Sequence, residues 1–257
     1  MKLSLQLVAL YTILVKEIRR FTRIWMQTIL PSAITVALYF LILGKFIGSR
    51  IGSVDGYPYI EFIAPGLIMM GIITNSYANT VSSFFSSKFQ RHIEEMLVSP
   101  MPNYIIILGF VLGGMARGLI VGVAVTLTAL VFTRLQLQNV TLVILTSILT
   151  AALFSTAGVI NGIFAKSFDD TSIVPTFVLT PLTYLGGIFF SISMLPEFWQ
   201  KASYANPILY MVNSFRMGIL GVSDVNLAIA MSVMVGLLIT LFMTSLYLLN
   251  KGTGTRS

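Results

Sequence analysis

The chain alternates between long apolar segments and short polar ones. An apolar run of about 20 residues can cross the hydrocarbon core of a bilayer as a helix. Six segments approach or exceed this length, so the pattern predicts an all-α polytopic membrane protein with one transmembrane domain over 1–257. The predicted spans are 24–43, 62–85, 104–132, 140–165, 172–192 and 227–249.

Residues 2–23 precede the first span and follow a different pattern. The apolar run between Lys2 and Lys16 has 13 residues, too few to cross a membrane, and no cleavage site of a signal peptide follows it. Apolar residues recur at helical spacing and basic residues gather at the end, which predicts an interfacial helix on the anionic leaflet. The apolar positions are Leu3, Leu7, Leu10, Leu14, Ile18 and Phe21.

The longest charged interruption between spans is the segment 86–103. Its apolar residues form one stripe at helical spacing over 88–97, and Ser99 and Pro100 would end the helix. Such a helix either docks into a groove of a partner or connects two spans in solvent, and the pattern favours neither. The stripe is Phe89, Ile93, Met96 and Leu97, and the charged face carries Lys88, Arg91, His92, Glu94 and Glu95.

Two predicted spans contain polar groups that hydrocarbon cannot satisfy. Asn75 and Asn79 lie in 62–85, where packing against other helices is the first interpretation and a substrate path the second. Arg117 interrupts 104–132, so it faces a wet cavity or a partner, or else extends its side chain to the membrane surface. The candidate acidic partners of Arg117, among which the sequence does not choose, are Glu94, Glu95, Asp169 and Asp170.

The same span, 104–132, is rich in glycine. Small residues four positions apart let two helices approach closely in a membrane, so the pattern predicts tight packing along this span. The glycines are Gly109, Gly113, Gly114, Gly118 and Gly122.

The segment 194–224 is too polar and too often broken by proline to be another span. Backbone that does not cross a membrane must be buried in protein or meet water, so short re-entrant helices are expected here. Their aromatic residues would lie at the membrane interface and form part of an outer gate. These are Trp199, Tyr204 and Tyr210.

Charge explains the orientation. The chain has 56% hydrophobic and 10% charged residues and a formal net charge of +7. With both termini on one side, ten Lys or Arg residues fall on that side and five on the other, with Arg117 left out. The positive-inside rule therefore places both termini in the cytoplasm and explains the basic composition without a nucleic acid partner.

Several classes of chemistry are disfavoured. The chain has no cysteine and a single histidine, so no thiolate or multi-histidine metal site is expected. No phosphate-binding loop of the G-x-x-x-x-G-K-[ST] type occurs, and the acidic residues fall in loops or at span ends. The energy for transport would then enter through another subunit. A self-contained channel or ion-coupled carrier with Arg117 in its pore is the alternative.

The order of these features resembles the ABC-2-type transporter permease family, and within it the bacterial YadH-like inner membrane permeases. The resemblance covers nearly the whole chain, and Gly186 stands where many relatives carry serine. The signature P-L-x-x-L-x-G, L-P, N-P-x-x-Y and Arg is present as Pro181, Leu182, Leu185, Gly187, Leu195, Pro196, Asn206, Pro207, Tyr210 and Arg216.

The resemblance implies a homodimer in the bacterial inner membrane that pairs with two copies of a cytoplasmic ABC ATPase. Mg-ATP would bind in that partner, and this chain would be a non-hydrolysing permease without a cofactor. Residues 86–101 would be the coupling helix, and the cargo a lipid, glycan or drug-like molecule. The candidate pathway or gate residues are Asn75, Asn79, Arg117, Pro181, Gly187, Pro196, Trp199, Asn206, Pro207, Tyr210 and Arg216.

Overall fold

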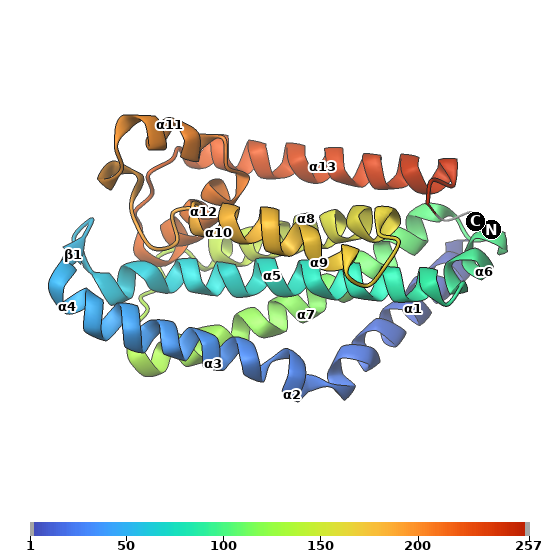
Figure 1. Cartoon of the computed structure of the whole chain (residues 1–257), viewed down its shortest axis with the longest axis horizontal. Helices are drawn as coiled ribbons and strands as arrows, with labels where there is room; N and C mark the ends of the chain where they lie inside the picture. Colours follow the sequence, from blue (N-terminus) through green and yellow to red (C-terminus); the bar gives the residue numbers. More distant parts are fainter. Residues whose placement is uncertain (1–2, 255–257) are drawn as a thin grey trace.

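The computed structural model describes residues 3–254 and is a bundle of long helices (Figure 1). One two-stranded antiparallel hairpin, in which Ser53–Val54 (β1) pairs with Tyr57–Pro58 (β2), lies at one end, here called the hairpin end. The opposite end, here called the α6 end, holds the short helix His92–Val98 (α6). Both described ends of the chain lie there, since Tyr104 Oη donates to Gln6 and Asn103 Nδ2 donates to Asn250.

The chain begins with the amphipathic helix Leu3–Arg23 (α1), as the spacing predicts, with residue 2 outside the described part. A nearly continuous helical segment, Trp25–Ile51, follows and is long enough to cross a membrane. It exceeds the predicted span 24–43 and breaks at Ile29, because Pro31 has no amide to bond to the preceding turn. Its parts are Trp25–Thr28 (α2), Leu30–Tyr39 (α3), the π-helical Phe40–Ile47 (η1) and Gly48–Ile51 (α4).

Three long helices form the centre of the bundle. Tyr59–Phe89 (α5) packs against Asn103–Phe132 (α7) and Val140–Phe164 (α8), and most of α5 is buried. The bounds of α7 and α8 agree with the predicted spans 104–132 and 140–165 to within one residue, whereas α5 extends the predicted span 62–85 by three residues at its start and four at its end.

The glycines of α7 allow close packing on two sides. A Cβ at Gly118 would overlap Ser76 Oγ of α5, and one at Gly109 would lie 2.5 Å from Ile13 of α1. The small residues therefore bring α5 and α1 against α7, as their spacing predicts.

The last helix, Leu227–Lys251 (α13), packs against α8 and extends the predicted span 227–249 by one half turn. Asn226 caps it, with Oδ1 accepting from the amide of Ala228 at 2.9 Å. Few of its side chains are buried, so a long apolar face is free to meet lipid. Within the described residues, five helical segments are long and apolar enough to span a membrane: Trp25–Ile51, Tyr59–Phe89, Asn103–Phe132, Val140–Phe164 and Leu227–Lys251.

The predicted span 172–192 is not one continuous helix. Helical structure ends at Tyr184, and its middle is π-helical because Pro175 and Pro181 lack the amides that an α-helix requires. Gly187, with φ of +74°, then turns the chain. The parts are Asp170–Val174 (α9), Pro175–Leu179 (η2) and Thr180–Tyr184 (α10).

The segment 194–224 folds into two helices at the hairpin end, after a short 3₁₀ turn over Ile192–Met194 (η3). Glu197–Tyr204 (α11) is largely exposed, whereas Pro207–Leu220 (α12) is buried against α5, α8 and α13. Because α12 packs within the bundle, Asn213 and Nη2 of Arg216 find hydrogen-bond partners in the protein, whereas Ser214 Oγ is buried without one among the described residues.

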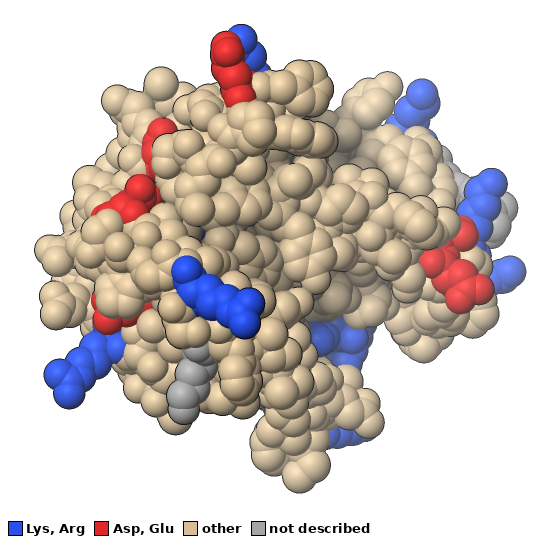
Figure 2. All heavy atoms as spheres, turned by 60° about the vertical axis from the view of Figure 1, so that its left-hand side comes forward, with Lys and Arg blue, Asp and Glu red and all other residues tan. Residues whose placement is uncertain are grey.

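Charged residues occupy little of the surface. In Figure 2 most of the visible face is formed by uncharged residues, and the charged side chains stand in small groups, several near the left and right edges and others at the top and near the centre. A surface with so few charges fits a bundle that is largely surrounded by hydrocarbon.

Candidate coupling surface, polar ladder and outer segment

The predicted helix over 88–97 is two helices in the structure. The helix α5 continues to Phe89, and the chain then turns at Arg91, which has a φ of +62°. A non-glycine residue in this left-handed region breaks helical spacing, so the stripe that begins at Phe89 does not continue along one helix. The helix α6 starts afresh at His92.

The apolar side of α6 faces its own bundle. Ile93 is 1% exposed and belongs to a cluster with Phe84 and Phe110, and Met96 and Leu97 pack against the same cluster. Three of the four stripe residues therefore anchor α6 to the chain. The stripe was expected to seat the helix on a partner. Ile93 cannot contact a partner, because its side chain is buried in this chain.

The charged residues of this region divide in the same way. Lys88 Nζ donates to the carbonyl oxygens of Ile163 and Ala165 at 2.6 and 2.7 Å, which ties the end of α5 to the end of α8. Lys88 thus satisfies helix-terminal carbonyls. The charged side chains that remain open to a partner are Arg91, His92, Glu94 and Glu95, with His92 Nδ1 3.8 Å from Glu95.

Phe168 joins this surface, although the sequence pattern did not single it out as a candidate residue. Its ring is 54% exposed and lies 4.9 Å from Phe85 and 5.3 Å from Phe89, which is 65% exposed. The signal in the sequence was a large aromatic residue between charged ones in a tight turn. Phe89 and Phe168 are here called the aromatic patch.

The turn that carries Phe168 is held by Asp170. Its Oδ2 accepts hydrogen bonds from the amides of Lys166 at 2.8 Å and Ser167 at 3.1 Å. The hydrogen bond from the Lys166 amide, followed by the one with the Ser167 side chain, lowers the pKa of Asp170.

A line of polar residues on α5, here called the polar ladder, faces α1 and α7. Its members, four residues apart, are Asn75, Asn79, Ser83 and Ser87. Arg20 Nη2 donates to the side-chain and backbone oxygens of Asn79 at 2.8 and 3.0 Å. Ser83 donates to the buried Glu17 at 2.6 Å, and Lys16 donates to Ser87 at 3.2 Å. Asn79, Ser83 and Ser87, spaced four apart on α5, therefore each meet a charged residue of α1.

Arg117 lies at the other end of the ladder. Its Nη2 donates to Asn75 Oδ1 at 3.3 Å, and Asn75 Nδ2 donates to Ser32 at 3.1 Å. The candidate acidic partners Glu94, Glu95, Asp169 and Asp170 form no ion pair with it. They are excluded because α6 and the turn before α9 lie at the α6 end, beyond the ladder.

At the hairpin end, Arg216 is the largest fully buried side chain among the described residues, at 1% exposed. Its guanidinium lies 4.0 Å from the ring centre of Phe62, and Nη2 donates to the Gly187 carbonyl at 2.5 Å. Nη1 lies 4.0 Å from Asp224, which accepts from Ser191 Oγ at 2.7 Å. Arg216 therefore joins α12 to the turn after α10 and to the loop before α13.

The other signature residues mostly shape this segment. Asn206 caps α12, accepting from the amide of Ile208 at 3.0 Å and donating to the Leu182 carbonyl at 2.6 Å. Tyr210 donates to the Tyr204 carbonyl at 2.7 Å. Of the other candidate gate residues, Pro181 lies in the first turn of α10, Pro196 just before α11, the exposed Trp199 on α11, and Pro207 at the start of α12.

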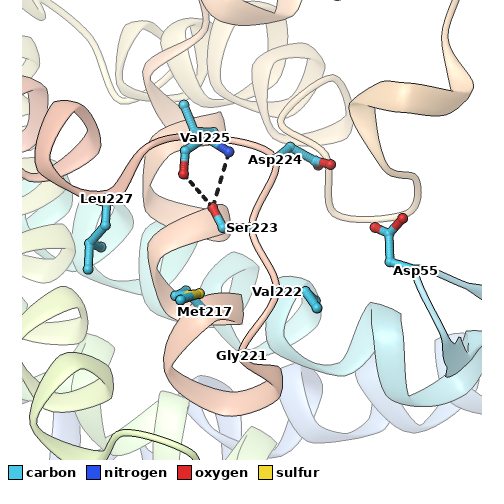
Figure 3. Close-up of a pocket in the computed structure, with 8 residues that line it drawn as sticks. All are labelled: Asp55, Met217, Gly221, Val222, Ser223, Asp224, Val225 and Leu227. Carbon is cyan, nitrogen blue, oxygen red and sulfur yellow. Dashed lines mark hydrogen bonds between the residues drawn. The ribbon is translucent and has the colours of Figure 1, made fainter.

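Two hollows lie near these residues. A pocket of about 460 Å³ opens between the hairpin and the loop before α13, with Asp55 and Asp224 on its wall and Ser223 bonded to Val225 (Figure 3). A groove of about 310 Å³ lies between α3, α5 and α10, and none of its lining residues is charged. Its hydroxyl groups include Ser32, Thr35, Tyr39, Thr74, Thr180 and Tyr184. Within 3–254, no group of three or more His, Asp or Glu residues is placed to hold a metal ion.

Comparison with known proteins agrees with this architecture. The model of the ABC-2 type transporter family matches residues 8–220. The chain is 55% identical to the inner membrane transport permease YadH of Escherichia coli (strain K12) over 97% of this chain and 98% of YadH. It is 27% identical to nodulation protein J of Sinorhizobium fredii over 68% of the chain and 67% of the relative, and 23% identical to that of Rhizobium leguminosarum bv. viciae over 88% of each.

The resemblance noted from the signature residues is therefore confirmed over most of the chain. The protein is a multi-span inner membrane permease that works with an ATPase subunit and has no catalytic role of its own. This chain belongs to the ABC-2 type transporter family.

Proposed function

We propose that this chain is the membrane half of an exporter that moves a lipid, glycan or drug-like molecule outward with energy from ATP. Two copies of the chain would pair with two copies of a cytoplasmic ATPase that binds Mg-ATP. The observation that carries the proposal is the aromatic patch at the α6 end, where Phe89 and Phe168 are exposed beside the charged residues of α6.

The proposal includes six crossings with both termini in the cytoplasm. The segment that follows α8 starts beside Asn161, whose Nδ2 donates to the Thr171 carbonyl at 3.2 Å. It reaches the hairpin end at Phe189, whose carbonyl accepts from Tyr59 Oη at 3.0 Å. A broken helix plus an extended turn would thus make the fifth crossing, since irregular backbone is tolerated at membrane depth where protein surrounds it.

Force from the ATPase would enter through the aromatic patch. Both rings contact the end of α5 or belong to it, and α5 continues as one helix to Tyr59 at the hairpin end. A push on this end would therefore tilt a rigid element that reaches the opposite surface. Arg91, Glu94 and Glu95 would set the register on the ATPase through charge.

The uncharged groove would be part of the pathway. Tyr39 and Tyr184 meet across it with their hydroxyl oxygens 3.1 Å apart, so α3 and α10 would have to separate for a cargo to pass. A second copy of the chain would cover the open side of this groove. The residues around Arg216, with Trp199 on α11, would form the exit.

The test uses the permease with its ATPase in proteoliposomes. The variant Phe89→Ala/Phe168→Ala should lose ATPase binding on a size-exclusion column and lose cargo-stimulated hydrolysis. The control, Phe177→Ala/Phe198→Ala, removes two rings that are even more exposed but lie away from the α6 end, and it should keep both ATPase binding and stimulated hydrolysis. Equal binding by both variants would overturn the proposed surface. Transport by the chain alone would instead favour a self-contained channel or ion-coupled carrier.

A further inference from the structure

The region between α1, α5 and α7 carries more positive than negative charge. Lys16, Arg20 and Arg117 are three cations around a single carboxylate, Glu17, which gives a net charge of +2. Glu17 is 0% exposed and lies 3.4 Å from Arg20, so one cation is compensated. Arg20 bonds to Asn79 and Arg117 bonds to Asn75, one helical turn apart on α5, so the two guanidinium groups lie on neighbouring turns of the same helix face. An arginine in a membrane helix is normally paired, and this pair lacks a second anion.

Hydrogen-bond donors are also left over. Arg20 Nε, Arg117 Nε and Asn79 Nδ2 are buried and have no partner among the residues that the structure describes. Asn79 is 0% exposed. A buried donor without an acceptor is costly, especially where no water is available. Glu17 Oε2 is an unbonded acceptor among the described residues, but Arg20 already faces it at 3.4 Å. A ligand that supplies only acceptors, such as a phosphate group, would satisfy this set.

The position in the bundle favours a lipid as the source of that phosphate. Arg20 lies in the last turn of α1, just before the chain enters its first spanning segment, and its side chain is 31% exposed. If α1 lies at the membrane interface, as its sequence predicts, Arg20 would be at the depth of the headgroups in the leaflet on the α6 side, which the proposed orientation makes cytoplasmic. That leaflet carries anionic lipids, and basic pockets between helices hold their headgroups.

We propose that Arg20, Arg117 and Asn79 form a binding site for the phosphate of an anionic lipid. The headgroup would lie between α1 and α7 and would bridge the two guanidinium groups. Because the ligand would join an interfacial helix to a central one, its occupancy would control how firmly α1 is held against the bundle.

The competing explanation is a purely internal network that holds α1 in place. The charge count separates the two. In an internal network, Glu17→Gln removes an ion-pair partner and only weakens the protein. At an anion site the same change raises the net charge to +3, so it should tighten binding of an anionic lipid.

The experiment measures lipid binding to the purified chain in neutral detergent, by native mass spectrometry, with phosphatidylglycerol and phosphatidylcholine as probes. No ATPase or cargo is needed, so failure here is distinguishable from failure of the proposed export function. Arg117→Gln should weaken phosphatidylglycerol binding about tenfold or more, as expected for a lost charge-assisted hydrogen bond. Glu17→Gln should tighten it. The control Arg19→Gln/Arg23→Gln removes two exposed cations of the same helix and should change it less than about twofold.

A second arm adds inorganic phosphate as competitor. Displacement of phosphatidylglycerol at millimolar phosphate would place a soluble phosphate compound, rather than a lipid, in the site. Unchanged binding in folded Arg117→Gln would overturn the proposal, as would an equal loss in the Arg19/Arg23 control. Should Arg117→Gln not fold, Arg117→Lys keeps the charge and should weaken binding by a smaller factor.

Discussion

Replacement of Arg216 tests whether a buried cation stabilises the segment 194–224. In Arg216→Met the chain keeps a side chain of similar length and loses three contacts: the Phe62 ring, the Gly187 carbonyl and Asp224. A buried cation–π contact contributes about 1–2 kcal/mol, and a hydrogen bond from a charged donor about 1.5–3 kcal/mol. At 4.0 Å the ion pair with Asp224 adds little, since Asp224 keeps its bond from Ser191.

Desolvation works in the opposite direction. Nε and Nη1 of Arg216 have no hydrogen-bond partner within residues 3–254, and a buried charge replaced by an apolar group can be neutral or stabilising. Subtracting about 1–2 kcal/mol for this relief leaves a net loss of about 2 kcal/mol in the free energy of unfolding. For a chain of this size that corresponds to a fall of about 5 °C in the melting temperature.

The assay is thermal unfolding of the purified protein in one detergent, followed by loss of the monodisperse peak. Arg134→Met is the matched control, because Arg134 is exposed and makes no hydrogen bond or ion pair with the described residues. It should melt with the wild type. A melting temperature of Arg216→Met at or above that of the wild type would refute the reasoning, because it would mean that desolvation outweighs all three contacts.

Three further changes test other parts of the bundle. Gly118→Ala should lower the free energy of unfolding by about 1–3 kcal/mol, because the added carbon overpacks against α5. Its control in the same melting assay is Gly236→Ala, which should be neutral because nothing lies within 4 Å of the added carbon. Lys88→Met should speed hydrogen exchange at the end of α8, while Lys201→Met, which breaks only a surface pair, should not. The pKa of Asp170 lies below its ordinary value of 3.8. The ionised carboxylate therefore stabilises the turn fully above pH 3.8, and this stabilisation is lost as the pH falls through the lowered pKa. The rate at which pepsin cuts the turn over 165–171 in the wild type, divided by the rate for Asp170→Asn at the same pH, should therefore be low at pH 4.5 and rise towards one as the pH is lowered below 3.8.

The spans with strong apolar character could be predicted to within a few residues. The helices α7 and α8 differ from the predicted 104–132 and 140–165 by one residue at one end. Membrane thickness sets the length of such a helix, and every backbone group must bond within it, so the local sequence is sufficient. The same reasoning does not apply to 172–192, where π-helical turns and Gly187 are accommodated by the protein around them.

The partners of the candidate residues depended on contacts between distant segments. Arg117 bonds to Asn75, 42 positions earlier, and Lys88 bonds to carbonyls 75 and 77 positions later. Nothing in the spacing of either residue indicates these pairs. Phe168 became a candidate only because the turn before α9 lies beside the end of α5.

The sequence by itself determined the class of the protein, its long apolar helices, its charge bias and its family signature, because each depends on local composition or on a fixed motif. Tertiary structure decided which side of α6 is free, which groups pair with Arg117 and Arg216, and where the fifth segment stops being helical. The physical reason is that a polar group in a membrane bonds to whatever the packed helices bring within about 3 Å, and that choice is made by the whole bundle.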